Sequence, residues 1–459
     1  MGPDGGSRDE PAQPSANDPG RQSSHDPGRP SFEDPGSRMV VAGIMSGTSL
    51  DGVDVAVMEV AGTDPETLTC GLLAFHSVLH PESLRDRLRQ VMAGSEGSVR
   101  EVALLHVELG RSFARALTTT LEEAGIDPDQ VAAAGSHGQT LWHEPPAVTL
   151  QLGCAHTLAE ATGVPVVSDF RSRDVAAGGE GAPLVPWADW VLFRRPGVGR
   201  ALQNLGGMGN VTFLPADQGP QSVLAFDTGP GVALLDGAAR RASQGREAWD
   251  HDGRRALAGE LNPTLLAHLM EHPFLRRPPP RSTGREAFGE PYLDELVGQA
   301  QPASQEDWND LLATLTAFTA RSVARSYQDF LPGGGVDEVV LTGGGARNPA
   351  LVQALTRFLD PIPVRTGPQA LSKGTLGTGG GLEVDPDARE AVAFALLAWA
   401  HLRGVPGNLP QVTGAEGPRV LGSWTPGAGH GGPRWIGWKS TGWTGGEGVE
   451  SSHGEGHDG

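Results

Sequence analysis

The feature that most constrains the fold of this chain is a glycine-rich loop between two apolar runs, which occurs twice. Residues 43–54 read GIMSGTSLDGVD and lie between MVVA and VAVMEV, and residues 201–215 read ALQNLGGMGNVTFLP. Apolar runs separated by such loops predict pairs of strands. A surface turn needs about two to five residues with one glycine. The first loop has more hydroxyls, backbone donors and carboxylates than a turn requires, which indicates a binding role.

Strands and helices alternate along the rest of the chain. Apolar residues at helical spacing predict helices in four segments, which are residues 83–93, 98–125, 154–163 and 307–331. Strands are predicted over 130–140 and 164–170, strand–turn–helix units over 223–242 and 336–359, and a last helix over 386–403. This alternation is typical of an α/β fold, and 459 residues exceed one ordinary core. We therefore predict two lobes, with lobe I over 39–200 and lobe II over 201–423.

The two ends of the chain differ in composition from its centre. Residues 1–38 are mainly Gly, Pro, Ser and Asp, and residues 424–459 are Gly-rich with scattered Trp. Neither segment can bury enough apolar surface to offset its chain entropy, which predicts disordered tails. The first apolar run follows Met39, so the native start could be Met1 or Met39.

The charge and the lysine content restrict the possible partners. A formal net charge of −20 argues against nucleic acid, because phosphate contacts need a basic surface. Lysine occurs only at Lys373 and Lys439, and no G-x-x-x-x-G-K-[ST] loop is present, so phosphate binding would depend on backbone N–H groups and a metal ion. The longest all-apolar run, 391–400, is too short to cross a bilayer. With two cysteines and no leader of a basic and an apolar region, the chain is predicted to be cytoplasmic and to bind no membrane.

Four glycine-rich junctions are candidate anion sites. Glycine also permits ordinary turns, so a purely structural role stays open for each of them, and a nest of backbone N–H groups is the functional alternative. In the first, SGTSLDGVD, the hydroxyls of Ser46, Thr48 and Ser49 can donate to phosphate oxygens. Asp51 and Asp54 in the same loop can hold Mg²⁺ through its water shell. The second, NLGGMGN, could bind phosphates from the opposite lobe.

The other two junctions follow predicted strands. The third, LTGGGARNP, has no charge within its glycine run and fits an adenosine group, with Asn348 capping the next helix. The fourth, FDTGPG, places Asp227 at the end of an apolar strand. Asp-Thr-Gly-Pro is also good turn chemistry, so an Asx-turn is the alternative interpretation of this carboxylate.

A further polar group lies in GSHGQTLWHEP and DFRSRD. His137 and His143 have no Cys or carboxylate neighbours at metal-ligand spacing, which argues against zinc and leaves substrate contact or loop structure. Arg171 and Arg173 lie beside two aspartates. These arginines either form local ion pairs or clamp a substrate carboxylate, for which guanidinium geometry is well matched.

Taken together, these strings resemble one protein family. The chain is similar to the bacterial anhydro-N-acetylmuramic acid kinases in eight strings in the same order, from about Met39 to Gly422: MSGTSLDGVD, SHGQTLWHEP, DFRSRDVAAGGEGAPLVP, NLGGMGN, FDTGPG, RSTGRE, LTGGGARNP and GNLPQVTGA. The resemblance implies the two-lobe fold of actin, sugar kinases and heat-shock ATPases (ribonuclease H-like), with the nucleotide in the interlobe cleft. It also implies a homodimer.

The resemblance assigns residues to roles. Asp227 matches the catalytic base of the family. The loop at 46–54 matches the ATP-binding segment of the family. With the second and third junctions, the candidate ATP site comprises Gly47, Thr48, Ser49, Leu50, Asp51, Gly52, Val53, Asp54, Gly206, Gly207, Gly343, Gly344, Gly345 and Asn348. The candidate contacts to an amino-sugar substrate are His137, Gln139, Thr140, Arg171, Arg173 and Glu390. The substrate's lactyl carboxylate would meet Arg171 or Arg173, and Glu390 either touches substrate or fixes its helix. The Mg²⁺ ligands stay unassigned.

The resemblance implies an unusual reaction. The family opens the 1,6-anhydro ring of anhydro-N-acetylmuramic acid with water and phosphorylates the 6-oxygen from ATP, which gives N-acetylmuramic acid 6-phosphate in cell-wall recycling. A carboxylate that accepts the proton of the attacking water fits this chemistry, and phosphoryl transfer needs mainly positioning and charge neutralisation. Two other hypotheses stay open: a kinase of the same fold acting on an ordinary sugar hydroxyl, and a non-catalytic actin-like ATP sensor or scaffold.

Four positions depart from the usual strings of the family. Val232 follows DTGPG where Asn is common, and Glu180 replaces Gln in GGQGAPL. Ala287 and Gly289 replace the aromatic and the amide of STGREYFN. The departures leave the predicted kinase fold and ATP binding intact, and they leave the sugar specificity open.

Overall fold

The computed structural model describes residues 38–47, 50–93, 98–367 and 386–428. The predicted N-terminal extension up to residue 37, the loop residues Thr48 and Ser49, and most of the predicted C-terminal tail lie outside the described residues. Trp424 and Thr425, which were predicted to belong to that tail, instead form part of a strand that pairs with residues 166–168.

Two β-sheets organise the described chain. The first has seven strands in the order β12-β6-β4-β1-β2-β3, with β5 paired to β4. Its strands are β1 (Arg38–Ser46), β2 (Gly52–Ala61), β3 (Thr69–Leu79), β4 (Val131–Glu144), β5 (Val148–Leu152), β6 (Val166–Ser168) and β12 (Ser423–Thr425). The second has five strands in the order β11-β10-β7-β8-β9. These are β7 (Arg200–Leu205), β8 (Met208–Leu214), β9 (Leu224–Pro230), β10 (Glu338–Thr342) and β11 (Val364–Arg365).

Both sheets have the same topology. β1, β2 and β3 form an antiparallel meander, and β4 and then β6 add in parallel on the other side of β1. In the second sheet β7, β8 and β9 form the meander, and β10 and then β11 add in parallel beside β7. The predicted α/β class is confirmed, and the repeated order of strands is the one expected of a duplicated ribonuclease H-like, actin-like fold. In each meander a glycine-rich loop joins the first two strands, as predicted.

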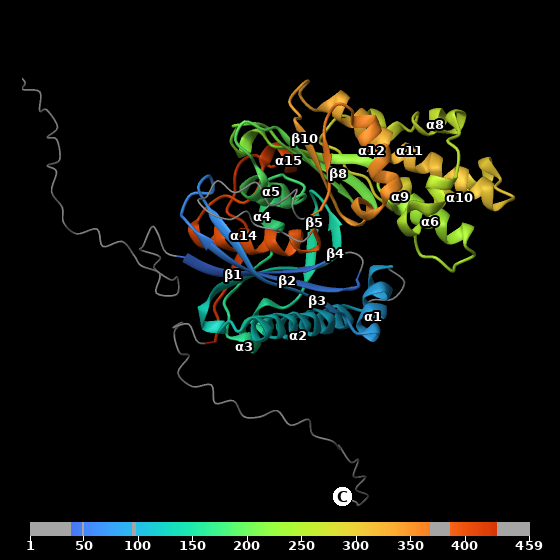
Figure 1. The fold of residues 1–459 in the computed structure, drawn as a ribbon. Helices are drawn as coiled ribbons and strands as arrows, with labels where there is room; N and C mark the ends of the chain where they lie inside the picture. The colour runs from blue at the N-terminus through green and yellow to red at the C-terminus, as the bar shows by residue number, and fades with distance from the viewer. Residues whose placement is uncertain (1–37, 48–49, 94–97, 368–385, 429–459) are drawn as a thin grey trace, which may run out of the picture. The chain divides into compact units, whose positions relative to one another are not determined.

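Alternate residues of β1 pack on opposite faces of the first sheet, as the twofold period of a strand requires. Ala42 and Ile44 lie in a core with α2 (Val99–Ala124) and α3 (Ala155–Thr162). Val41 and Met45 lie in a core with α5 (Val185–Phe193) and α14 (Arg389–Arg403). Figure 1 shows α2 and α14 on either side of this sheet.

Two glycines bring α14 directly onto the first sheet. Gly43 of β1 pairs with Gly135 of β4. A Cβ atom on Gly43 would lie 1.9 Å from the carbonyl oxygen of Ala391, and one on Gly135 would lie 2.1 Å from that of Phe394. The helix backbone therefore occupies the space in which side chains would otherwise stand, and this contact fixes the position of α14 on the strands.

The division into lobes at residue 200 stays a prediction. The second sheet runs from Arg200 to Arg365, whereas α14, which was predicted to belong to lobe II, packs with the first sheet, as does β12. A division that followed the sheets would therefore place residues 389–425 with the first lobe.

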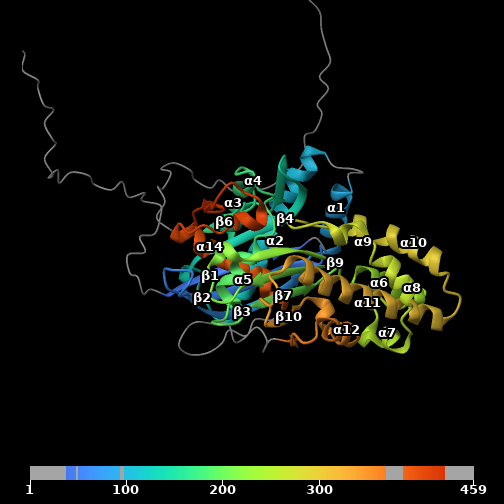
Figure 2. The same ribbon diagram turned by 90° about the horizontal axis from the view of Figure 1, so that it is seen from above.

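The second sheet shares one core with a group of helices. α6 (Ala233–Ala242), α11 (Gln305–Phe330) and α12 (Pro349–Leu359) bury apolar side chains against it. Four further helices lie between α6 and α11 in sequence, and Figures 1 and 2 show them gathered near α11: α7 (Arg254–Ala258), α8 (Pro263–Leu269), α9 (Arg285–Phe288) and α10 (Glu290–Ala300). The other described α-helices are α1 (Glu82–Met92), α4 (Ser172–Val175) and α15 (Pro410–Thr413). None of the helices in the described ranges combines the length and the apolar character needed to cross a membrane.

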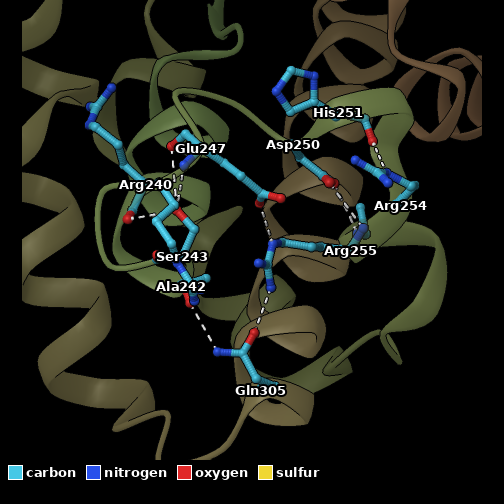
Figure 3. Close-up of polar contacts among 11 residues, drawn as sticks. Arg240, Ala242, Ser243, Glu247, Asp250, His251, Arg254, Arg255 and Gln305 are labelled. Carbon is cyan, nitrogen blue, oxygen red and sulfur yellow. Dashed lines mark hydrogen bonds and ion pairs between the residues drawn. The ribbon is translucent and has the colours of Figure 1, made fainter.

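A polar cluster joins α6, α7 and α11 (Figure 3). Asp250 is buried, and its two carboxylate oxygens accept the backbone N–H groups of Arg255 and Ala256, each at 3.0 Å. The Arg255 side chain bonds Glu247 at 2.9 Å and Gln305 at 2.7 Å. Because both oxygens of Asp250 have donors in the first turn of α7, this carboxylate serves as a helix cap.

Candidate active site

A cavity of about 540 Å³ is lined by residues from both sheets and from α14. His143 comes from β4, Glu180 from the loop between α4 and α5, Asp227 from β9 and Glu390 from the first turn of α14. Residues between 277 and 282 complete the wall. The volume lies in the range of small-molecule sites, and several titratable groups converge on it, so it is the candidate active site.

The main chain around Asp227 is fixed by the segment that precedes α9. Asp227 donates its N–H to the carbonyl of Arg281 at 3.2 Å, and Arg281 Nε donates to the carbonyl of Asp227 at 2.8 Å. The backbone N–H of Thr283 donates to Asp227 Oδ2 at 2.8 Å. No described residue donates to Oδ1. One carboxylate oxygen is thus held in place, and the other stays available to a reactant in the cavity.

The surroundings of Asp227 raise its pKa to about 6. Burial is the main cause, because a desolvated carboxylate favours its neutral form. The hydrogen bond from Thr283 and the charge of Arg281 lower the pKa, and the charge of Glu286 raises it. A carboxylate with a pKa near 6 is mostly ionised at neutral pH and can still accept a proton, which is the property of a general base.

Glu390 enters the cavity beside a buried ion pair. Its neighbour Arg389 bonds Asp189 of α5, with Nε 2.8 Å from Oδ1, and the hydroxyl of Thr212 donates to Asp189 Oδ2 at 2.9 Å. Burial raises the pKa of Glu390, while Arg389 and Arg171 oppose that shift. The Arg389–Asp189 pair joins α14 and α5 to β8 of the second sheet, and it holds the start of α14 at the cavity.

Two described residues of the first glycine-rich loop are hydrogen-bonded to each other. Gly47 accepts the N–H of Leu50 at 3.2 Å, and Leu50 has a φ of 60°. A branched residue with positive φ is uncommon and marks a backbone held by its surroundings, which is typical of functional loops. Gly52 and Val53 begin β2, and a Cβ on Gly52 would lie 2.4 Å from the carbonyl oxygen of Val78. This glycine therefore has a packing role whether or not the loop binds phosphate.

The hydroxyl of Ser46, a predicted phosphate donor, is used within the protein. It is buried and lies 2.7 Å from Gln139 Oε1, 3.0 Å from His80 Nε2 and 3.0 Å from the carbonyl oxygen of Gly52. Gln139 is fully buried as well. The side chains of Ser46 and Gln139 therefore bond to each other and stabilise the start of the loop, and neither lines the cavity.

The carboxylates of the loop fit a hydrated magnesium ion. Burial raises the pKa of Asp54, and the charges of Asp51 and Asp387 raise it further. A cation would relieve this repulsion. No group of three or more His, Cys, Asp or Glu side chains in the described ranges is arranged to hold a metal ion, but Mg²⁺ commonly needs only one or two carboxylates with water and phosphates.

The second, third and fourth glycine-rich junctions meet near the end of β7. The carbonyl oxygens of Gly206 and Gly207 accept the N–H groups of Val232 and Gly231, at 2.8 and 3.0 Å. A Cβ on Gly345 would lie 2.7 Å from that of Leu205, so packing alone requires this glycine.

Gly343 and Gly344 differ in whether the structure requires a glycine at that position. Gly343 has a φ of 77°, which favours glycine, whereas Gly344 faces open space. The predicted helix cap is confirmed, because Asn348 Oδ1 accepts the N–H groups of Ala350 and Leu351 at 3.0 and 3.3 Å.

Most predicted substrate contacts lie outside the cavity wall. Arg171 donates from Nε to His137 Nε2 at 3.0 Å and from Nη1 to the carbonyl of Gly181 at 2.8 Å. His137 is buried, and its Nδ1 donates to the carbonyl of Gly138 at 2.7 Å. Both side chains are already bonded to the protein. Arg171 could therefore bind a substrate carboxylate only through guanidinium N–H groups that these bonds do not use.

The remaining candidates separate clearly. Thr140 is half-buried and bonds Gln151, and Arg173 is exposed. Only Glu390 of the six predicted substrate contacts lines the cavity. His143 and Arg281 line it without having been assigned to the site. Both residues lie in strings that resemble the family, His143 in SHGQTLWHEP and Arg281 as the first residue of RSTGRE, so the sequence offered a signal for each of them.

Comparisons with known proteins identify the family of this chain. The family model described as anhydro-N-acetylmuramic acid kinase matches residues 39–427. The chain belongs to the anhydro-N-acetylmuramic acid kinase family. A relative with that name from Gloeobacter violaceus is 44% identical over 383 residues, which cover 82% of this chain and 96% of the relative. One from Salinibacter ruber is 43% identical over 397 residues, which cover 84% and 96%.

Solved structures add little to this family assignment. A ROK family glucokinase from Streptomyces griseus, in complex with glucose and AMPPNP, is 13% identical with a TM-score of 0.34, and the match covers 78% of this chain and 98% of the glucokinase. A ROK hexokinase from Thermus thermophilus is 18% identical with a TM-score of 0.30, covering 73% and 97%. The fold is assigned from the sheet topology described above.

Among the four positions at which this kinase departs from the family strings, Glu180 is the one that lines the cavity. Val232 packs near Gly345, and Ala287 packs against the core of the second sheet. A Cβ on Gly289 would lie 2.2 Å from the carbonyl oxygen of Arg285. A change in sugar recognition would therefore be expected from Glu180 first.

Proposed function

We propose that this chain uses ATP to open the ring of 1,6-anhydro-N-acetylmuramic acid and to phosphorylate its 6-oxygen, with Asp227 as the base. The observation that supports this role is the position of Asp227 in a cavity lined from both sheets, with one oxygen bonded to Thr283 and the other available. Family membership identifies the reaction class, and the geometry supports this carboxylate as the group that carries it.

The chemistry follows from the needs of the ring. Water is a poor nucleophile toward the anomeric carbon, so Asp227 accepts a proton from the water as the new C–O bond forms. The bond between the anomeric carbon and the 6-oxygen then breaks. The freed 6-oxygen forms a bond to the γ-phosphorus of ATP, and ADP departs. The proton on Asp227 is released to solvent, so one water, one sugar and one ATP give one sugar 6-phosphate and ADP.

The chain's own groups position the two reactants. Backbone N–H groups of the loops at 47–52 and 206–207 would hold the phosphates, and the 343–345 segment would face the adenosine. Asp51 and Asp54 would hold Mg²⁺, which when bound neutralises charge on the phosphates. Glu390 lines the cavity, where the charge of Asp54 contributes to its raised pKa, and it would bond the sugar. We further propose that the enzyme acts in the cytoplasm as a homodimer.

The test is a direct assay with the full chain, ATP, Mg²⁺ and the anhydro sugar, followed by mass spectrometry and phosphorus NMR. The expected product is a reducing sugar 6-phosphate that has gained one water. Running the reaction in oxygen-18 water should place the label at the anomeric hydroxyl, and early sampling limits later exchange. A phosphorylated product that retains the anhydro ring and no label would favour an ordinary sugar kinase. ATP binding without any product would favour a sensor or scaffold.

A further inference from the structure

Arg281 is a buried cation that donates one hydrogen bond, from Nε, to the main chain of Asp227. Its side chain is 5% exposed. In addition to the Nε bond to Asp227, Nη1 donates to the carbonyl of Arg277 at 2.9 Å and Nη2 donates to the hydroxyl of Ser326 at 2.7 Å. The carbonyl of Arg281 itself accepts the N–H of Asp227. The two residues are thus joined through main chain and side chain.

The guanidinium group is enclosed by aromatic rings. Its central carbon lies 5.3 Å from the ring centre of Phe226, 4.9 Å from that of Phe274 and 4.5 Å from that of Phe330. No carboxylate of the described residues lies within ion-pair distance of it. Ring faces stabilise a cation without neutralising it, so the positive charge of Arg281 remains effective at the cavity.

We infer that Arg281 is the positioning residue of the base: it holds the Asp227 main chain and supplies the positive charge that keeps the Asp227 carboxylate ionised. The inference depends on the proposed function, because only a base needs to be ionised before the reaction. Like other core arginines, Arg281 bonds nearby carbonyls, which are those of Leu275 and Arg277. In addition, its side chain and its own carbonyl are both bonded to the main chain of the same aspartate, Asp227.

The charges around the pair agree with this role. The Arg281 charge lowers the pKa of Asp227 against the effect of burial, and Glu286 raises it. On the arginine side, burial lowers the pKa of Arg281 to about 10, Asp227 and Asp329 raise it, and Arg277 and Arg325 lower it. Even so, Arg281 stays protonated throughout the range in which Asp227 titrates. Besides Asp227 and Arg281, the ionisable groups that line the cavity are Arg277, Glu180, Glu390, Arg389 and His143, and none of their side chains bonds Asp227.

The decisive experiment measures the titration of Asp227 directly. The full chain is labelled with carbon-13 at the aspartate carboxyl carbons, and the Asp227 signal is assigned by its loss in Asp227→Asn. In Arg281→Met, which keeps the bulk within the aromatic rings and removes the charge, the pKa of Asp227 should rise by about one unit or more. An unchanged titration would overturn the inference. This measurement needs no turnover, so its failure is distinct from failure of the proposed function.

A matched control removes a neighbouring cation instead. Arg325 of α11 bonds Asp329 and the carbonyl of Met270, and it makes no contact with Asp227. Arg325→Met should leave the Asp227 signal in place. An equal shift in both variants would show a general field effect and would overturn the assignment to Arg281.

Kinetics separate the two parts of the role. Arg281→Met should shift the acid limb of kcat/KM to higher pH, with kcat recovering at alkaline pH and the affinity for an ATP analogue unchanged. Arg281→Lys keeps the charge but cannot reproduce the donor pattern, so it should keep the Asp227 titration near its original position while kcat falls. If Arg281→Met fails to fold, Arg281→Lys still decides: loss of kcat at every pH supports the positioning role, and full activity overturns it.

Discussion

Two acidic side chains near the cavity, Asp174 and Asp227, have opposite surroundings. Asp174 is fully buried, and its oxygens accept three donors: the N–H of Gly181 at 2.8 Å, Asn408 Nδ2 at 2.7 Å and Thr413 Oγ1 at 2.8 Å. Asp227 has one donor on one oxygen. The first carboxylate is satisfied on both sides, and the second has bonding capacity to spare where the cavity opens.

The difference indicates what each carboxylate is for. A buried carboxylate with three donors holds the segments that supply them, and here it joins the loop of Glu180 to the segment around α15. A carboxylate that is desolvated but underbonded is destabilising in the folded state and useful to a reaction. Asp250 resembles Asp174, because both of its oxygens cap α7. The expected effects of substitution therefore fall on stability for Asp174 and on turnover for Asp227.

The largest expected effect is on turnover in Asp227→Asn. The amide keeps the bond to Thr283 but cannot accept the proton of water, so kcat should fall about a thousandfold or more while an ATP analogue still binds. Steady-state assays and calorimetry measure the two quantities. Asp236→Asn is the matched control, because burial raises the pKa of Asp236 to about 6 as well, yet its side chain does not line the cavity. Comparable losses in both variants would contradict the comparison.

The next effect is on stability in Asp174→Ala. Removal of this carboxylate takes an acceptor from three buried donors and leaves the N–H of Gly181 without its partner, which should lower the free energy of unfolding by about 3 kcal/mol. Urea titration followed by circular dichroism measures it. At saturating substrate the folded fraction should keep most of its kcat. A loss of kcat as large as that of Asp227→Asn, with stability unchanged, would make Asp174 part of the chemistry instead.

A smaller effect is the dependence of kcat/KM and of the free energy of unfolding on pH. Since the Asp227 pKa is raised to about 6, kcat/KM should fall about tenfold for each unit of pH below that value. The stability term has the opposite direction. A carboxyl group whose folded pKa is above its unfolded value stabilises the fold below the unfolded pKa of 3.8, and this contribution is lost as pH rises through about 6.

The stability term can be measured apart from turnover. Asp227→Asn should therefore be more stable than the unsubstituted enzyme at neutral pH and equally stable in acid. Thermal unfolding of the two proteins across that range measures the difference. A pH-independent difference between them would show that Asp227 is not desolvated.

Local patterns in the sequence were sufficient for much of the fold. α2 and α11 carry apolar residues at helical spacing, and the loops between the first two strands of each meander contain the glycines that mark them. β3 was not predicted, because this edge strand shows no clean alternation and exposes Leu73 and Leu79 at 46% and 76%. The position of α14 depends on Gly43 and Gly135, and contact between segments so distant in the chain leaves no local pattern.

The site was only partly predictable, because many of its contacts also join segments that are distant in the chain. Asp227 was identified from its own string, and it lines the cavity, while its role as the base stays a prediction. Arg171 and His137 were predicted to contact substrate because of their residue types. Their partners come from other segments, and the structure shows them bonded to each other. The Arg389–Asp189 pair joins residues 200 positions apart and could not be read from either neighbourhood.

The smallest expected effect concerns Asn348, a predicted ATP contact whose side chain, like that of Asp174, is already bonded within the protein. Asn348 was predicted both to cap α12 and to contribute to the ATP site, and its Oδ1 already accepts two backbone N–H groups. Asn348→Ala should then lower the free energy of unfolding by about 1 kcal/mol, the usual loss of a helix cap, and change the affinity for ATP less than twofold. Asn348→Asp is the control, because it keeps the cap and removes the amide donor. Weaker ATP binding in Asn348→Asp with stability retained would show that the amide nitrogen contacts the nucleotide. A side chain that is bonded within the protein would then also have a role in ligand binding.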